Sequence, residues 1–131
     1  MRKRLFTGSI AVLLVILIAY LVWHTYDLST DYNYATAKLD IKNGNAKIIH
    51  IGTHKISSKE KDLEMLAARY GFKNLYIEKF TAQQTEKGIK DYNELVETYL
   101  VLRNGPDWKE NYQREVDSLL SITEPGKDRN H

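Results

Sequence analysis

A run of 19 uncharged residues near the N-terminus constrains this chain more than any other feature. No residue from Leu5 to Trp23 carries a charge, and the first acidic residue of the whole chain is Asp27. At 1.5 Å per residue such a helix spans about 28 Å, close to the roughly 30 Å hydrocarbon thickness of a bilayer. The 108 residues that follow are too few and too hydrophilic to surround it on every side. We therefore expect residues 1–27 to form a basic tip and a transmembrane helix.

The charges that flank this run predict its orientation. Residues 2–4 are all basic, whereas Asp27 and Asp31 follow the run and the next basic residue is Lys38. Positively charged flanks stay on the cytoplasmic side of a membrane. The sequence thus predicts a single-pass protein with a cytoplasmic N-terminus and an extracytoplasmic C-terminal domain, on the periplasmic or extracellular side.

Aromatic residues mark the outer end of the predicted span. Tyr20, Trp23 and Tyr26 fall where amphipathic rings prefer the headgroup layer. A cleavable signal peptide is the alternative, because it also has a basic start and an apolar core. Such a core is about 7 to 15 residues long and ends at small residues, whereas this run is longer and ends in bulky ones. The details favour an uncleaved signal anchor.

Charge and cysteine content exclude several function classes. The chain has 19 basic and 17 acidic residues, and without residues 2–4 the remainder is close to neutral. A near-neutral body without a basic face does not predict nucleic-acid binding, which depends on neutralising phosphates. The absence of cysteine excludes disulfides, thiolate nucleophiles, thiolate zinc sites and iron–sulfur clusters.

The first part of the body predicts a βαβ unit. A helix over 31–42, capped by Ser29 or Thr30 or else continuing the membrane helix as a stalk, precedes a β-branched strand over 46–51. Ser57 and Glu60 then resemble a capping box that starts a helix, which is expected to run to Tyr70 and to end at Gly71. A second strand follows over 74–80. Two strands joined by a helix within this length predict parallel pairing with a right-handed crossover.

The second part of the body is helical. Apolar residues recur at helical spacing over 85–103 and again over 108–120, and Asn104-Gly105-Pro106 separates the two segments. So short a connection predicts an antiparallel helix hairpin. The predicted class is α/β (or α+β), with a transmembrane helix, a small extracytoplasmic domain over 28–122 and a disordered polar tail over 123–131.

One loop is a candidate ligand site. It connects the end of the first strand to the start of the next helix, a position where α/β proteins bind anions on backbone amides. Its candidate ligand-binding residues are Gly52, Thr53, His54, Lys55 and Ser58. His50 and His54 are four apart, but they span a strand end and a glycine turn, so their spacing does not indicate a metal site.

Catalytic motifs are missing from the sequence. It contains no Gly-x-Ser-x-Gly elbow, no phosphate-binding glycine motif and no histidine-flanked serine. We therefore expect no catalytic residues, no metal and no cofactor. The sequence favours a membrane-anchored, non-enzymatic accessory protein of the cell envelope that contacts the lipid bilayer and a partner protein. The alternative is a small anionic-ligand-binding or hydrolytic domain that uses the loop over 52–58.

Overall fold

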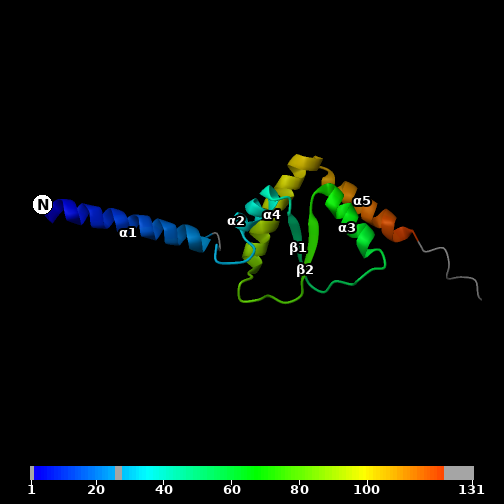
Figure 1. Cartoon of the computed structure of the whole chain (residues 1–131), viewed down its shortest axis with the longest axis horizontal. Coiled ribbons are helices and arrows are strands. Elements are labelled where there is room, and N and C mark those ends of the chain that lie inside the picture. Colours follow the sequence, from blue (N-terminus) through cyan, green and yellow to red (C-terminus); the bar gives the residue numbers. More distant parts are fainter. Residues whose placement is uncertain (1, 26–27, 123–131) are drawn as a thin grey trace, which may run out of the picture.

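The computed structural model describes residues 2–25 and 28–122, and side chains from residue 7 onward. These residues form five helices and a two-stranded parallel sheet. Figure 1 shows one long helix that projects from a folded body, in which the sheet lies between two pairs of helices. In chain order the elements are α1 (Arg2–Thr25), α2 (Tyr34–Lys42), β1 (Lys47–Ile51), α3 (Glu60–Tyr70), β2 (Lys73–Ile77), α4 (Glu86–Asn104) and α5 (Trp108–Ser121).

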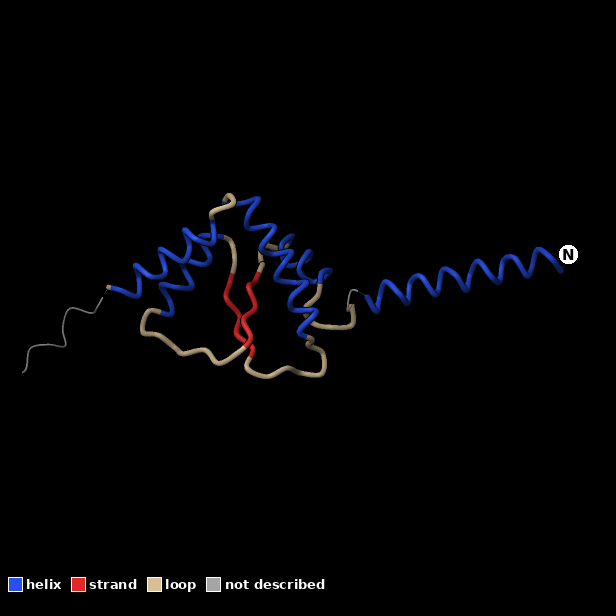
Figure 2. The backbone as a smooth tube through the Cα atoms, turned by 180° about the vertical axis from the view of Figure 1, so that it is seen from behind, coloured by secondary structure: helices blue, strands red, loops and turns tan. Residues whose placement is uncertain are grey.

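Helix α1 is the long apolar helix that the sequence predicts. Thr7–Thr25 has a mean hydropathy of 2.1, and none of it is buried against the rest of the chain. Both views show it extending away from the body (Figures 1 and 2). It is long and apolar enough to cross a membrane or to serve as a signal sequence.

The predicted parallel pairing of the two strands is confirmed. Lys47 pairs with Lys73 and Ile51 with Ile77, in continuous register. Helix α3 connects the strands, as expected of a βαβ unit. The second strand is shorter than predicted, because the chain leaves the sheet at Ile77 and does not continue to Phe80.

The starts of α2 and α3 differ from the predictions. Asn33, not Ser29 or Thr30, caps α2: its side chain accepts hydrogen bonds from the amides of Ala35 and Thr36. Asn33 is 1% exposed, so a buried asparagine provides the cap. Helix α2 therefore begins at Tyr34, three residues later than predicted.

The capping box predicted for α3 is incomplete. The Glu60 carboxylate accepts the Ser57 amide at 3.5 Å, but the Ser57 hydroxyl accepts from Lys59 and not from Glu60. The helix begins at Glu60, without a side-chain cap at Lys59. Its predicted end is confirmed, because Gly71 adopts the left-handed conformation with φ of 99°.

The predicted antiparallel packing of α4 on α5 is wrong. The two helices meet at Gly105 and then diverge, and each packs on a different partner: α4 on α2 and β1, α5 on α3 (Figures 1 and 2). The physical reason is that each apolar stripe is already occupied. Tyr92, Val96 and Leu100 of α4 are fully buried in the core, while Trp108 of α5 packs edge-on against Phe72.

A single hydrophobic core joins the helices of the body to the sheet. Helix α4 contributes more buried residues than any other element, and the strands contribute one buried side chain each. The buried core residues are Ala37, Ala46, Ile49, Ala67, Phe72, Ile77, Ile89, Tyr92, Val96, Leu100 and Trp108.

Candidate functional site

A cleft of about 480 Å³ opens between α3, α5 and one face of the sheet. Strand pairing places His50 of β1 beside Tyr76 of β2, with both side chains on the same face. Helix α3 contributes carboxylates to the opposite wall. The polar and aromatic residues that line the cleft are His50, His54, Glu60, Glu64, Asn74, Tyr76, Tyr112 and Gln113.

One chain of hydrogen bonds crosses the floor of the cleft. Nε2 of His50 lies 2.8 Å from Oδ1 of Asn74, and Nδ2 of Asn74 lies 3.1 Å from the hydroxyl of Tyr112. An amide oxygen only accepts, so His50 donates through a protonated Nε2. The Asn74 amide therefore links β1 to α5 through β2, and all three side chains are held in fixed orientations.

His54 forms the mouth of the cleft. Its Nε2 lies 2.9 Å from Oε1 of Glu60, and its ring stacks on Tyr76 at a centroid distance of 3.8 Å. The ring of His50 also stacks on Tyr76, at 4.8 Å. Two histidines that are separate in sequence thus meet at one tyrosine. The parallel register of the strands could have predicted the contact of His50 with Tyr76, because it sets these two residues opposite each other.

The electrostatics of the cleft favour neutral or cationic groups over anions. Burial raises the pKa of Tyr76 above its ordinary value of 10.0, and the nearby Tyr112 and Glu60 raise it further. Tyr76 therefore stays neutral at physiological pH. Glu60 and Glu64 are the charged groups that line the cleft. Over residues 7–25 and 28–122, no cluster of three or more His, Cys, Asp or Glu side chains is placed to hold a metal ion.

Of the five predicted ligand-binding residues, one lines the cleft. His54 lines the cleft, and it is half-buried. The other four, Gly52, Thr53, Lys55 and Ser58, are exposed along the loop between β1 and α3. The Glu60 carboxylate already accepts the Ser57 amide near the start of α3. Anion binding by this loop stays a prediction.

Two of the three predicted interface residues lie near the C-terminal end of α1. Tyr20 is 61% exposed and Trp23 is 55% exposed, whereas Tyr26 lies outside the described residues. The rings of Tyr20 and Trp23 are exposed, as a role in the headgroup layer requires. That role itself stays a prediction.

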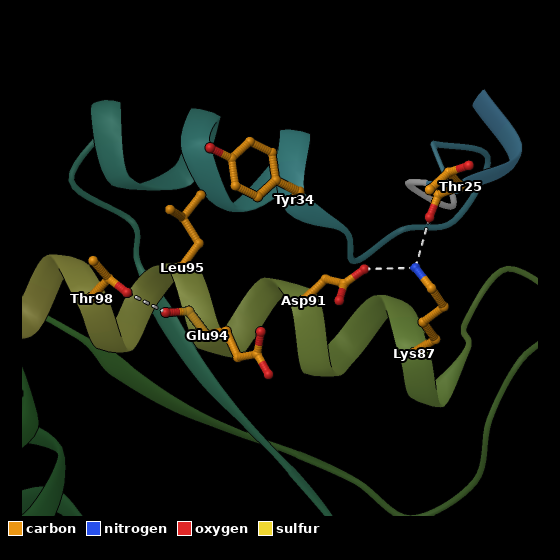
Figure 3. A pocket seen from close by; sticks show the side chains of 7 residues that line it. All are labelled: Thr25, Tyr34, Lys87, Asp91, Glu94, Leu95 and Thr98. Atoms are coloured by element: carbon orange, nitrogen blue, oxygen red, sulfur yellow. Dashed lines mark hydrogen bonds and ion pairs between the residues drawn. The ribbon is translucent and has the colours of Figure 1, made fainter. Parts of the chain in front are cut away.

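A second hollow, of about 430 Å³, lies where α1 meets the body (Figure 3). Nζ of Lys87 donates to the Thr25 carbonyl at 2.7 Å and to Oδ2 of Asp91 at 2.9 Å. A cation at a helix C-terminus is favourable because that end of the helix dipole is negative. Lys87 therefore connects the start of α4 to the end of α1, a contact that sequence analysis did not predict.

Comparison of the chain with protein-family models, with curated proteins and with solved structures finds no match.

Proposed function

We propose that the protein is a single-pass membrane protein that holds its α/β body at the outer face of a cell-envelope membrane and acts there by binding another protein. The N-terminus lies in the cytoplasm, and α1 is an uncleaved anchor. The body is an accessory module without catalytic activity of its own.

The observation that carries the proposal is the exposure of the apolar stretch of α1. Every residue from Thr7 to Thr25 is exposed, although the mean hydropathy of this stretch is 2.1. A helix that is apolar on all sides needs an apolar solvent, and a bilayer provides one. The basic residues at positions 2–4 and the acidic residue at 27 support the proposed orientation.

The arrangement of the body supports binding over catalysis. In the cleft, Nε2 of His50 bonds Asn74 and Nε2 of His54 bonds Glu60, so both histidines have structural partners. Within residues 28–122, the residues that line the cleft include no serine, threonine or cysteine that either histidine could activate as a nucleophile. The body also exposes large apolar side chains, including Met65 on α3, that the core does not use.

Membrane insertion and orientation are tested by fractionation and a C-terminal reporter. We expect the full-length chain to remain with membranes at alkaline pH, to dissolve only in detergent, and to carry a reporter that is active outside the cytoplasm. A matched variant changes residues 2–4 to glutamate and Asp27 and Asp31 to lysine, and it should lower the reporter signal. Full-length protein in the soluble fraction would contradict the anchor, and an inactive wild-type reporter would contradict the orientation.

Protein binding is tested by cross-linking in cells at native expression. We expect the full chain to cross-link to a partner protein. In the control, residues 1–27 carry an unrelated domain in place of the body, and the cross-linked product should be absent. Recovery of the bait alone, or the same product from the control, would contradict a binding role for the body.

A further inference from the structure

The two outer edges of the sheet differ in whether their outward main-chain groups are hydrogen-bonded. At the edge of β1, the side chain of Asn93 in α4 bonds the main chain of Ile49 twice: Oδ1 accepts the N–H at 2.9 Å, and Nδ2 donates to the carbonyl at 2.8 Å. These are the bonds that a neighbouring strand would make. One asparagine therefore occupies the outer edge of β1 at its middle residue.

The outer edge of β2 has no such closure. The Lys73 amide donates to Ala46, and the Ile77 carbonyl accepts from Gly52, so the main chain of both residues faces β1. Because the direction alternates along a strand, the N–H and C=O groups of Asn74 and Tyr76 face outward. Within residues 28–122, no hydrogen bond reaches these four groups.

A groove of about 420 Å³ runs beside this open edge. Helix α3 forms one wall with Glu64, Met65 and Ala68, and Lys73 and Asn74 of β2 form the other. Met65 is 56% exposed, and a methionine side chain adapts readily to the shape of a bound apolar group. Unpaired main-chain groups therefore lie next to a site for a side chain.

We propose that the outer edge of β2 binds an extended segment of another polypeptide, which adds to the sheet as a third strand. The inference rests on the proposed role in protein binding and names the surface that performs it. The added strand pairs its main chain with Asn74 and Tyr76. An apolar side chain of the strand enters the groove at Met65, between the charges of Glu64 and Lys73.

The position of α1 favours a different protein over a second copy of this chain. Both views place α1 on the side of the body that carries β1, α2 and α4, away from β2 (Figures 1 and 2). Antiparallel pairing of two copies through β2 would direct their α1 helices in opposite directions, whereas one bilayer must receive both. A segment of another protein meets no such conflict.

The first test measures amide exchange in the full-length protein in lipid nanodiscs. In the free protein, the Asn74 and Tyr76 amides should exchange faster than those of Leu75 and Ile77, which face β1. The probe is a peptide selected on the full-length protein from a displayed library of about ten-residue segments, longer than the usual strand of five to six. Its binding should slow exchange at Asn74 and Tyr76.

Two variants at one position separate the main chain from the side chain. Tyr76→Pro removes the outward N–H and leaves the ladder to β1 intact, and Tyr76→Ala keeps that N–H. We expect Tyr76→Pro to weaken peptide binding at least about tenfold relative to Tyr76→Ala. If Tyr76→Pro does not fold, a second variant tests the groove. Met65→Glu, on the α3 wall of the groove, should weaken peptide binding. Leu102→Glu is its control, because Leu102 is an 83% exposed residue of α4.

Each outcome decides the proposal. Equal binding by the Pro and Ala variants, or a peptide that leaves both amides unprotected, overturns it. Protection that rises with protein concentration without peptide also overturns it and indicates a second copy. In cells, cross-linking of the Tyr76→Pro variant to the same partner would contradict the role of the β2 edge but not the proposed function. A wild-type body that cross-links to nothing would contradict the proposed function itself.

Discussion

The two halves of the body differ in how their polar groups are used. On the side of α2 and α4, the hydroxyl of the buried Tyr92 donates to Asp40 at 2.7 Å, and Lys47 bonds the same carboxylate, with both charged side chains partly buried. On the side of α3 and α5, polar groups line an open cleft, where Asn74 and His54 reach solvent. In the first half Asn93 occupies the outer edge of β1, and in the second half the outer edge of β2 has no such partner within residues 28–122.

This difference separates stability from recognition. Buried and satisfied groups in the α2–α4 half are expected to dominate the free energy of unfolding, because a buried group that loses its partner bears the full cost of desolvation. Groups in the α3–α5 half can exchange a lost partner for water. The proposed binding of another protein needs accessible surface, and the α3–α5 half offers it.

The largest effect should come from a core leucine of α4. Leu100 is fully buried, so Leu100→Ala should lower the free energy of unfolding by about 2–5 kcal/mol. Leu102→Ala is the matched control, because Leu102 lies on the same helix and is 83% exposed. Chemical denaturation of the full-length chain in detergent measures both. Equal losses would show that α4 does not carry the core.

Tyr92 should make the closed half sensitive to alkaline pH. Burial, and next the hydrogen bond to Asp40, raise the pKa of Tyr92 far above 10.0. A raised pKa means that this stabilisation is complete below pH 10 and is lost as the pH rises above it. At pH 7, Tyr92→Phe should cost about 1.5–3 kcal/mol, since the bond is to a charged group.

The measurement is the free energy of unfolding from pH 7 to pH 11 for both proteins. The wild-type advantage over Tyr92→Phe should shrink above pH 10, because Tyr92 ionises there in the unfolded chain but stays neutral in the folded one. A constant difference across this range would contradict the buried bond.

Two asparagines compare the halves directly. Each side chain makes two hydrogen bonds. Asn93 bonds the main chain of the buried Ile49, whereas Asn74 bonds two side chains of the open cleft. We expect Asn93→Ala to cost about 1–3 kcal/mol and Asn74→Ala about 1 kcal/mol or less. Thermal or chemical unfolding ranks the two. A larger loss for Asn74→Ala would reverse the assignment of the stabilising half.

The smallest effect should come from exposed ion pairs. Arg114 and Glu110 on α5 lie 3.3 Å apart, and their side chains are 70% and 78% exposed. Solvent screens such a pair, so Glu110→Gln should change the free energy of unfolding by no more than about 0.5 kcal/mol. A change above 1 kcal/mol in denaturation would mean that α5 depends on this pair.

The sequence predicted the local elements of the fold better than their packing. The β-branched strand before Gly52 and the helix that ends at Gly71 follow from short-range patterns, and the structure has both. The antiparallel packing of α4 on α5 was predicted from the short connection at Gly105, and it is wrong. A connection sets where two helices meet, but the partners that bury their apolar faces set how they pack.

The cleft shows the same limit at the level of single residues. His50 and His54 were identified as a pair without helical geometry, and nothing in their spacing places either of them near Tyr76. Strand register and the path of a loop bring the three rings together. Asn74, Asn93 and Tyr112 had no sequence signal, because amide and hydroxyl groups have no characteristic spacing when their partners lie on other elements.

By itself, the sequence determined which parts of this protein are apolar on all sides, apolar on one face, or polar, since these patterns depend only on neighbouring residues. That was enough to identify the membrane-length helix, the parallel βαβ unit and the absence of familiar catalytic motifs. Only the tertiary structure decided which half is closed, which sheet edge is open and which side chains share the cleft. Those features arise from contacts between residues far apart in the chain, and their geometry exists only once the elements have packed.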